Sequence, residues 1–349
     1  LKGVRITVKS EQKPINVAVV GATGAVGEEM IQGLESRKFP VGTLLPLTSE
    51  RSAGTMVSFS GREIETLKTT LEAFENIDLA LFSAGSNVSQ EWGRQLEQKG
   101  IVVIDNSRAF RMDSDVPLVV PEVNSKAISD TSKLIANPNC STIQLVLALA
   151  ALRIVCPLKR IVITTFQSAS GAGRNAMDEL RDQTVDLLNF REPKVNHFSR
   201  RLAFDVLPQI DTFEPDGYTG EEHKMINETR KILNLPDLPV TVTCVRVPVF
   251  VGHSMAVNVE FERDFSMEAV QNALANAQSL IFNEADEDFP TASDCAGSDE
   301  VYVGRLRRDK SVAHAVDLWI TADNLRKGAA TNAIQIAEYM VEHVFTPTS

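Results

Sequence analysis

The stretch INVAVVGATGAVG, residues Ile15 to Gly27, decides the fold of this 349-residue chain. It starts with a short apolar run rich in valine, which is typical of a strand buried on both faces of a parallel sheet. A glycine-rich turn follows, and Met30, Ile31 and Leu34 then form the apolar stripe of an amphipathic helix. A strand, a tight turn and a helix in this order begin a βαβ unit. The stretch therefore predicts a Rossmann-type, doubly wound parallel sheet.

The turn itself carries Gly21, Gly24 and Gly27. Glycines let a backbone approach a pyrophosphate, and the helix N-terminus neutralises part of its charge. The spacing is G-x-x-G-x-x-G and not G-x-G-x-x-G, so the letters alone are a weak match. The placement of the turn between a strand and a helix is what favours a dinucleotide site. The alternative is a tight turn that binds nothing.

The same alternation continues through the first part of the chain, so we expect the doubly wound sheet to occupy residues 15–139. Small residues from Ser83 to Ser86 would let a cofactor lie close to the carboxyl edge of this sheet. Further strands are expected near residues 43–47, 78–82, 101–104 and 134–136, with an amphipathic helix over residues 88–99.

The segment after the second strand bears on the identity of the cofactor. An NAD enzyme usually presents an acidic side chain here to the ribose 2′-hydroxyl. This chain offers Ser49, Arg51 and Ser52, a cation and two hydroxyls that suit a 2′-phosphate. Glu50 would repel that phosphate if it pointed inward. The segment therefore favours NADP over NAD.

A second informative stretch is Asn137-Pro-Asn-Cys-Ser-Thr142, which follows a short strand. The run Ile143 to Leu152 comes next and is long and rich in alanine and leucine, so it predicts a buried helix. Asn139 or Ser141 is a good N-cap for that helix. Cys140 would then lie at the positive end of the helix dipole, which is expected to lower its pKa and favour the nucleophilic thiolate. The alternative is a structural cysteine, which is our interpretation of Cys156, Cys244 and Cys295.

The second part of the chain mixes strands and helices and predicts an α+β domain with a mixed sheet. The turn Gln167 to Gly173 is either a second anion cradle or a flexible turn, and residues 284–299 are expected to be a loop. The last helix is expected to pack back on the first domain. Strands are expected over residues 160–166, 240–249, 255–261 and 312–321, and helices from about 175, over 219–232 and over 329–344.

Several polar residues of this part stand out. Arg246 shares a strand face with apolar residues, so its guanidinium needs a carboxylate from the protein or from a ligand. Glu221 and Lys224 lie three apart on one helix, for which a surface ion pair is the ordinary interpretation. His253 follows a glycine and is expected to sit in a turn with an exposed, mobile ring, and a lone histidine is usually incidental.

Composition limits the classes of function. A hydrophobic content of 43% and a charged content of 23% over 349 residues suit a globular protein of two domains. The net charge of −11 argues against a general nucleic-acid or acidic-membrane surface. Four cysteines without paired spacing argue against a disulfide framework, and we predict no metal site. No apolar run reaches transmembrane length, and residues 1–14 lack a signal-peptide core but suit a tag, a native extension or the tail of a transit peptide. A cytoplasmic location is expected, or a plastid.

With these features in place, the chain resembles the aspartate-semialdehyde dehydrogenases from about Ile15 to Val344. The resemblance implies NADPH-dependent conversion of L-aspartyl 4-phosphate to L-aspartate 4-semialdehyde through a cysteine thioester, in the biosynthesis of lysine, threonine, methionine and diaminopimelate. It implies a homodimer or homotetramer, and no nucleic-acid or membrane partner. It rests on the order and spacing of GATGAVG, SERSAG, FSAGS, DNSRAFR, VPLVVPEVN, NPNCSTIQ, QSASGAG, EEHKM, CVRVPV, GH and NLRKGAATNAIQIAE.

The resemblance also assigns roles to individual residues. In the catalytic group Cys140 would be the nucleophile, His253 the general acid and base, Gln167 the residue that orients the thioester, and Asn139 a donor to the oxyanion. The substrate would be bound by Arg246 at its α-carboxylate, Glu221 at its amino group and Arg111 and Lys224 at its phosphate, with Ser170 and Gly171 beside them. The cofactor would be bound by Gly21, Thr23, Gly24, Ala25, Val26, Gly27, Ser49, Arg51, Ser52, Ser83, Ala84, Gly85, Asn106, Gly173, Asn332 and Gln335.

The implied division is a dinucleotide-binding domain over residues 1–139, completed by a C-terminal helix over 325–349, and a catalytic and dimerisation domain over 140–324. Residues 189–204 differ from the family pattern, and their role stays open. Rivals of similar build are the N-acetylglutamyl-phosphate reductases and the glyceraldehyde-3-phosphate dehydrogenases, and a rival of another class is a non-catalytic paralogue. The EEHKM spacing favours aspartyl phosphate, and the joint presence of Cys140, Gln167, Arg246 and His253 argues against a paralogue.

Overall fold

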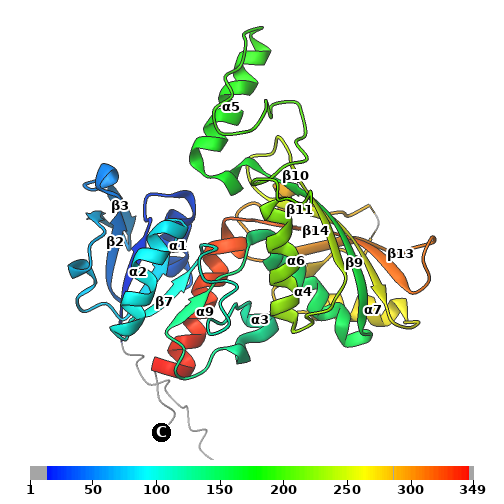
Figure 1. Ribbon diagram of the computed structural model, residues 1–349, viewed down its shortest axis with the longest axis horizontal. Coiled ribbons are helices and arrows are strands. Elements are labelled where there is room, and N and C mark those ends of the chain that lie inside the picture. Colours follow the sequence, from blue (N-terminus) through cyan, green and yellow to red (C-terminus); the bar gives the residue numbers. More distant parts are fainter. Residues whose placement is uncertain (1–13, 286, 346–349) are drawn as a thin grey trace, which may run out of the picture.

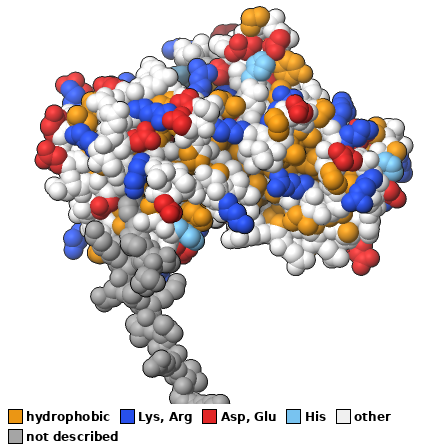
Figure 2. All heavy atoms as spheres, turned by 60° about the horizontal axis from the view of Figure 1, so that its bottom comes forward, with side chains coloured by type: hydrophobic (Ala, Val, Ile, Leu, Met, Phe, Trp, Pro, Cys, Tyr) orange, Lys and Arg blue, Asp and Glu red, His pale blue; other side chains and the backbone are white. Residues whose placement is uncertain are grey.

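The structure is a computed structural model and describes residues 14–285 and 287–345. Two six-stranded sheets form the body of the molecule, the first from the N-terminal part of the chain and the second from the remainder (Figure 1). Acidic and basic side chains are interspersed over the face seen in Figure 2. The interpretations offered for the opening residues fall almost wholly on residues 1–13, which lie outside the described residues.

The first sheet is parallel throughout and has the order β5-β2-β1-β6-β7-β8. The chain starts in the middle, at β1, and is wound outward in both directions, which confirms the predicted doubly wound fold. The ends of β1, β2 and β6 come together, because Val20 is paired with both Leu47 and Phe82. The strands are β1 Ile15–Val20, β2 Val41–Thr48, β5 Leu67–Lys68, β6 Leu79–Phe82, β7 Val102–Asp105 and β8 Leu134–Ala136.

Alternate residues of these strands face opposite sides of the sheet. On one side Val17 and Leu81 pack with α1 and α9, and on the other Phe82 packs with α2. The last helix therefore packs on the first sheet, as predicted, and Arg37 after α1 forms an ion pair of 2.7 Å with Glu338 of α9. The helices are α1 Ala25–Ser36, α2 Ser86–Gln98 and α9 Thr331–Met340, and π-helical turns flank α9 at Arg326–Ala330 (η5) and Val341–Phe345 (η6).

The connections of the first domain contain elements that were not predicted. A hairpin, β3 and β4, turns through Ser60 and Gly61, whose φ angles of 51° and 73° match the two-residue turns that suit the twist of hairpins. The remaining elements are β3 Met56–Phe59, β4 Arg62–Glu65, α3 Pro121–Asn124 and the 3₁₀ turns η1 Glu50–Ser52, η2 Glu72–Phe74 and η3 Ser125–Ala127.

The second sheet has the order β10-β9-β11-β14-β13-β12 and mixes parallel and antiparallel pairs, which confirms the predicted mixed sheet. Its strands are β9 Leu158–Gln167, β10 Val240–Arg246, β11 His253–Phe261, β12 Leu280–Phe282, β13 Val301–Arg308 and β14 Ala315–Ala322. Its helices and turns are α4 Cys140–Val155, η4 Ala169–Ala172, α5 Arg174–Leu188, α6 Gly220–Leu233, α7 Met267–Ala275 and α8 Ala292–Cys295.

Two expectations for this part were incomplete. Strands β12 and β13 were not predicted, and the acidic segment expected to be a loop contains the one-turn helix α8. Thr291 and Asp294 form a reciprocal capping box at its start, so a local polar pair starts the helix despite the surrounding acidic residues.

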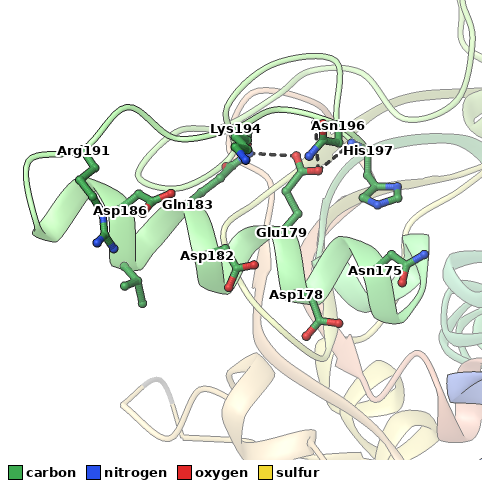
Figure 3. Close-up of a pocket in the computed structure, with 11 residues that line it drawn as sticks. Asn175, Asp178, Glu179, Asp182, Gln183, Asp186, Arg191, Lys194, Asn196 and His197 are labelled. Carbon is green, nitrogen blue, oxygen red and sulfur yellow. Dashed lines mark hydrogen bonds and ion pairs between the residues drawn. The ribbon is translucent and has the colours of Figure 1, made fainter.

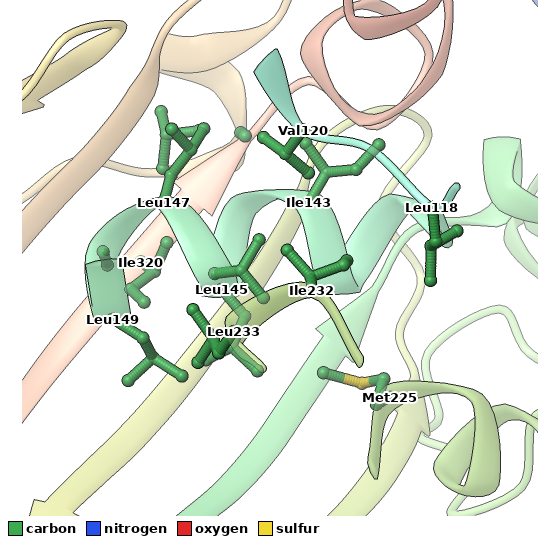
Figure 4. Close-up of a cluster of buried hydrophobic side chains, with 14 of the residues drawn as sticks. Leu118, Val120, Ile143, Leu145, Leu147, Leu149, Met225, Ile232, Leu233 and Ile320 are labelled. Carbon is green, nitrogen blue, oxygen red and sulfur yellow. The ribbon is translucent and has the colours of Figure 1, made fainter. Parts of the chain in front are cut away.

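Helix α4 is the core of the second domain. Its side chains are buried on nearly all sides, as expected of an alanine- and leucine-rich run. Figure 4 shows Leu145 and Leu149 of α4 packed among side chains of α6 and β14, while Ile143 lies near Val120 of the first domain. One apolar cluster thus spans both domains. Among the described helices, none is long and apolar enough to cross a membrane.

Helix α5 stands away from the body of the molecule (Figure 1) and organises the segment whose role was open. Its buried Glu179 accepts hydrogen bonds from the backbone N–H groups of Asn196 (3.0 Å) and His197 (2.7 Å), as Figure 3 shows. Gln183 accepts from the N–H groups of Leu202 and Ala203. Two polar side chains of α5 therefore hold residues 196–203, which form no helix or strand, in place.

The burial of α4 leads to a test of its role in stability. Leu149→Ala should destabilise the fold by roughly 2–5 kcal/mol, because a fully buried leucine leaves a cavity. Ile154 lies on the same helix and is 82% exposed, so Ile154→Ala should change stability by less than about 0.5 kcal/mol. Urea unfolding followed by circular dichroism measures both. Equal effects of the two changes would contradict the central position of α4.

Candidate active site

A cavity of about 270 Å³ lies where the two domains meet, and Cys140 is on its wall. It brings together residues from the first turn of α1, from the start of α4, from α6 and from strands β9 and β10. The predicted site residues on its wall are Val26, Asn106, Arg111, Asn139, Cys140, Gln167, Ser170, Gly171, Glu221, Lys224 and Arg246.

The start of α4 is held by Asn139. The side-chain oxygen of Asn139 accepts hydrogen bonds from the N–H groups of Ser141 (3.0 Å) and Thr142 (3.2 Å), so Asn139 is the N-cap. Its side-chain amide donates to Glu221 at 3.0 Å, and its backbone N–H donates to Glu228 at 2.6 Å. The residue before Cys140 is therefore fixed on three sides.

The predicted surface ion pair of Glu221 and Lys224 is instead part of the cavity wall. The Glu221 carboxylate is buried and lies 2.7 Å from the Lys224 ammonium. Its other oxygen accepts hydrogen bonds of 3.0 Å from Asn139 and Gln167. Burial opposes its ionisation, but Lys224 and the bonds from Gln167 and Asn139 lower the pKa of Glu221 to about 2. The surface interpretation was wrong because the start of α6 packs against α4 and β10.

The prediction of a lowered pKa at Cys140 was also wrong. Burial and the nearby Glu221 carboxylate raise the pKa of Cys140 to about 11, and they outweigh Arg111, Lys224 and Arg246, which act in the opposite direction. The positive end of the α4 dipole does not lower the pKa of Cys140 enough to offset these effects, since the N–H groups of Ser141 and Thr142 already donate to Asn139. In the resting site Cys140 is therefore a thiol.

Arg246 is the last residue of β10 and is 6% exposed. It lies on the face of the strand that the alternation of apolar residues predicted to be buried. Its guanidinium donates to the backbone oxygen of Ser168 at 2.6 Å. Among the described residues no carboxylate lies within ion-pair distance of it. Of the two partners that the sequence left open, a ligand carboxylate is therefore the one that fits.

His253 was expected to be exposed and mobile, but it begins β11 and is fully buried. Its Nδ1 accepts a hydrogen bond of 3.1 Å from the backbone N–H of Ser168, which leaves the proton of the neutral ring on Nε2. Nε2 has no hydrogen-bond partner among the described residues, and a Cβ placed on Gly171 would lie 2.9 Å from it. Burial, followed by Arg246, lowers the pKa of His253 to about 3. The ring is thus a neutral Nε2 donor directly behind the cavity wall.

The cationic side of the cavity contains Arg111 and Lys224. Lys224 lies between Glu221 and Asp211, at 2.7 Å and 3.2 Å. Arg111 pairs with the buried Glu228 at 2.9 Å. Glu228 was missed by the sequence analysis, although it lies four residues after Lys224 and seven after Glu221 and so shares their helix face.

Other cavity residues were missed as well. Asn324 accepts hydrogen bonds from Ser168, Ser170 and the N–H of Gly252, and so joins the turn after β9 to the turn before His253. The signal for this residue was its place in the NLRKGAATN motif. The missed wall residues are Arg108, Ile210, Asn324, Leu325, Gly328 and Ala329.

The glycine turn has the shape that a dinucleotide site requires. Gly21 has φ 87°, and a Cβ there would lie 2.9 Å from the Ser83 backbone. A Cβ on Gly27 would lie 2.1 Å from the Gly21 carbonyl oxygen, so helix and turn pack as only glycine allows. Gly24 caps α1 without a side-chain hydrogen bond, which leaves the first N–H groups of Ala25 and the residues after it for an anion. Thr23 contacts Thr48 beside this turn.

The segment predicted to hold a 2′-phosphate forms a 3₁₀ turn at the end of β2. Glu50 forms an exposed ion pair of 3.0 Å with Lys68. Its charge is therefore offset, and it does not repel a phosphate bound near Ser49 and Arg51. Arg51 is exposed and has no ion-pair partner among the described residues. Ser49 and Ser52 flank it.

The remaining predicted cofactor residues fall into two groups. Ser83, Ala84 and Gly85 follow β6 beside the glycine turn, and Gly173 caps α5, whose Arg174 pairs with Glu28 of α1. Asn332 and Gln335 are engaged elsewhere, because both contact the buried Lys327 and are absent from the described cavity wall. Within the described ranges, no group of three or more His, Cys, Asp or Glu side chains is arranged to hold a metal ion.

Comparison with protein families agrees with this geometry. Residues 16–131 match the semialdehyde dehydrogenase NAD binding domain, and residues 149–327 match the semialdehyde dehydrogenase dimerisation domain. Fold and site thus define an NAD(P)-dependent semialdehyde dehydrogenase, an oxidoreductase.

Individual relatives narrow this class. An aspartate-semialdehyde dehydrogenase of Aquifex aeolicus is 47% identical over 332 residues, which cover 93% of this chain and 98% of the relative. That of Bacillus subtilis is 46% identical over 336 residues, 93% of this chain and 96% of its own. The crystal structure of aspartate semialdehyde dehydrogenase II from Vibrio cholerae complexed with ASA has a TM-score of 0.92 and 47% identity, and covers 95% of this chain and 99% of its own. The chain belongs to the aspartate-semialdehyde dehydrogenases.

The family confirms the predicted nicotinamide cofactor, at the level of NAD(P), and the presence of a dimerisation domain. The boundary between residues 139 and 140, the roles of single residues and a cytoplasmic location stay predictions.

The raised pKa of Cys140 leads to a test by alkylation. Glu221→Gln should lower the pKa of Cys140, because it removes the nearest negative charge. Below that pKa, each unit of decrease raises the thiolate fraction about tenfold, so iodoacetamide should react several-fold faster near pH 8. The other three cysteines are buried, and Cys140→Ser gives the background. An unchanged or slower reaction would show that Glu221 does not control the thiol.

Proposed function

We propose that the chain reduces L-aspartyl 4-phosphate to L-aspartate 4-semialdehyde with release of phosphate, through a thioester on Cys140. The observation that carries the proposal is the shared wall of one cavity. The residues that line it include Cys140, Arg246 without a carboxylate partner among the described residues, the cations Arg111 and Lys224, and Val26 in the first turn of α1. An acyl phosphate needs a thiol nucleophile, an anion pocket and a reductant, and each has a candidate here.

In the first step the Cys140 sulfur attacks the acyl carbon, and the bond from that carbon to the phosphate oxygen breaks. Because the resting group is a thiol, its proton must leave as the sulfur attacks. The phosphate leaving group lies beside Arg111 and Lys224 and takes that proton as it departs, so it is released as HPO4²⁻. His253, protonated at Nε2, donates a hydrogen bond to the carbonyl oxygen as negative charge develops on it.

In the second step the thioester carbon accepts a hydride, and the Nε2–H of His253 stabilises the negative charge on the oxygen of the resulting thiohemiacetal anion. The bond from that carbon to sulfur then breaks to give the aldehyde and a Cys140 thiolate, which takes up a proton from water. NADPH supplies the hydride when it is bound. The groups that would hold its pyrophosphate are the backbone of Gly21 to Gly27 and the uncapped N-terminus of α1. Gln167, which is held by its hydrogen bond to Glu221, orients the thioester formed on Cys140.

Recognition of the amino acid part would use two opposite charges. Arg246 binds the α-carboxylate with its remaining guanidinium donors, since among the described residues the hydrogen bond to Ser168 occupies only one of them. Glu221 faces the ammonium group. The aldehyde formed in this way is the precursor from which lysine, threonine, methionine and diaminopimelate derive in the proposed pathway.

The proposed assembly is a homodimer, or a homotetramer built from it, through the second domain. The match to a dimerisation domain over residues 149–327 supports this. Phe190 and Phe204, which are 100% and 66% exposed around the protruding α5, provide apolar surface for such a contact. A non-catalytic paralogue is disfavoured, because Cys140, Gln167 and Arg246 line one cavity and His253 lies directly behind its wall.

The test of the proposal is phosphate-dependent reduction of NADP by aspartate semialdehyde, which is the reverse reaction. Cys140→Ala should abolish it, since no thioester can form, while circular dichroism and the thermal unfolding temperature stay as in the parent chain. N-acetylglutamate semialdehyde is the control substrate. Full activity of Cys140→Ala would overturn the mechanism, and a preference for the control substrate would overturn the assignment of substrate.

A separate test concerns the cofactor. Arg51→Ala should raise the KM for NADP by about tenfold or more and leave the KM for NAD nearly unchanged, because a charge-assisted bond to the 2′-phosphate is lost. Arg160, another exposed arginine without an ion-pair partner among the described residues, provides the matched control Arg160→Ala. If the preference for NADP survives Arg51→Ala, the 2′-phosphate is bound elsewhere.

A further inference from the structure

We propose that Glu228 is a positioning residue that ties the phosphate-binding Arg111 to the loop that carries Cys140. The proposal deepens the function proposed above and rests on it for the identity of the anion. Glu228 touches neither the sulfur nor, on the proposed scheme, the substrate. It acts through the two residues that it holds.

The two oxygens of the Glu228 carboxylate have different partners. Oε1 lies 2.9 Å from Nη1 of Arg111, and Oε2 accepts a hydrogen bond of 2.6 Å from the backbone N–H of Asn139. The side chain is 1% exposed, so both contacts are shielded from water. Hydrogen bonds to an ionised group are shorter and stronger than those between neutral groups. The carboxylate thus fixes the distance between a cation and a backbone group that are 28 positions apart in the sequence.

On the side of Asn139, this contact completes the support of the nucleophile loop. The side chain of Asn139 already caps α4 and contacts Glu221, so only its backbone N–H is left to be satisfied. Without Glu228 that N–H would be buried without a partner, one residue before Cys140. The loop would then shift to find another acceptor or water.

On the side of Arg111, Glu228 orients a guanidinium that would otherwise swing. Nη1 is held by Glu228, Nη2 donates to the backbone oxygen of Asn106 at 2.8 Å, and Nε is buried without a partner among the described residues. Because Nη1 and Nη2 are both held, the guanidinium presents its donors to an anion in one fixed orientation. Phosphate bound there and the sulfur of Cys140 are therefore positioned by one side chain.

A glutamine at this position cannot do the same. It offers one oxygen and one NH₂ group, whereas both partners of Glu228 are donors, so one of the two contacts must be lost. A role through charge alone predicts the opposite sign. Removal of a negative charge beside Arg111 would strengthen phosphate binding, whereas loss of positioning weakens it. The direction of the change therefore separates the two roles.

The experiment compares Glu228→Gln with Glu222→Gln in the reverse reaction, with inorganic phosphate as the varied substrate. Glu222 is a matched control, because it is buried on the same helix but accepts from the N–H groups of Thr219 and Cys244. Glu228→Gln should raise the phosphate KM and lower kcat, each by about tenfold or more, since a charge-assisted bond is lost. Glu222→Gln should lower the unfolding temperature and change both constants less than about threefold. A lower phosphate KM in Glu228→Gln, or equal effects of the two changes, would overturn the proposal.

Two further variants sharpen the test. Glu228→Asp keeps the charge but is too short to reach both partners, so it should not restore the phosphate KM, and it serves if Glu228→Gln does not fold. In an Arg111→Ala background, Glu228→Gln should leave the phosphate KM unchanged and still lower kcat through Asn139. Additive effects on KM, or full rescue by aspartate, would contradict the positioning role.

A readout without turnover separates this proposal from the proposed function. Inorganic phosphate bound near Cys140 should slow its alkylation by iodoacetamide, because an anion raises the pKa of the thiol. The phosphate concentration for half of that effect should rise about tenfold in Glu228→Gln and stay within threefold in Glu222→Gln. If this holds while aspartate semialdehyde is not oxidised, the proposed function fails and the role of Glu228 stands. If the concentration is unchanged in Glu228→Gln, the role of Glu228 fails whatever the substrate.

Discussion

Two buried carboxylates on one face of α6 hold the residue before Cys140, and the rest of the site depends on this contact. Glu221 receives the side-chain amide of Asn139, and Glu228 receives its backbone N–H. A buried carboxylate is very costly in free energy unless it is paired with a cation. Glu221 is paired with Lys224, and Glu228 with Arg111. The cationic side of the cavity and the loop before Cys140 are therefore both held by the same pair of carboxylates.

Burial and neighbouring charges also set the protonation of Cys140 and His253. Burial and Glu221 keep Cys140 protonated, while burial and Arg246 keep His253 neutral. The raised pKa lowers the thiolate fraction of Cys140 and with it the rate of oxidation or alkylation of this thiol. In the proposed reaction, the ammonium group of the substrate would offset Glu221 and its phosphate would accept the proton, so the nucleophile would be activated by the substrate that it attacks.

Closure of the cavity depends on the end of the chain. The π-helical turn at 326–330 lies so close to α4 that a Cβ on Gly328 would come within 3.0 Å of the Cys140 Cβ. Lys327 in this turn is fully buried and pairs with Glu122, and Asn332 reaches Asn137 in the loop before Cys140. Chain segments some 190 positions apart are thus linked beside the cavity, and α9 packs on the first sheet although it follows the second sheet in the sequence.

The sequence by itself determined the strands and helices with clear periodicity, the glycine turn, the Asn139 cap, the interior face of Arg246 and, through motifs, most of the cavity residues. These depend on short-range geometry, which a chain carries locally. It did not determine the burial of His253 and Glu221, the thiol state of Cys140, the hairpin of β3 and β4, or the part played by Glu228. Burial and charge pairing arise only when α4, α6 and β11 pack together. The dipole at the start of α4 was a correct local observation, but desolvation and a carboxylate brought in from another helix outweighed it, and only the tertiary structure decided that balance.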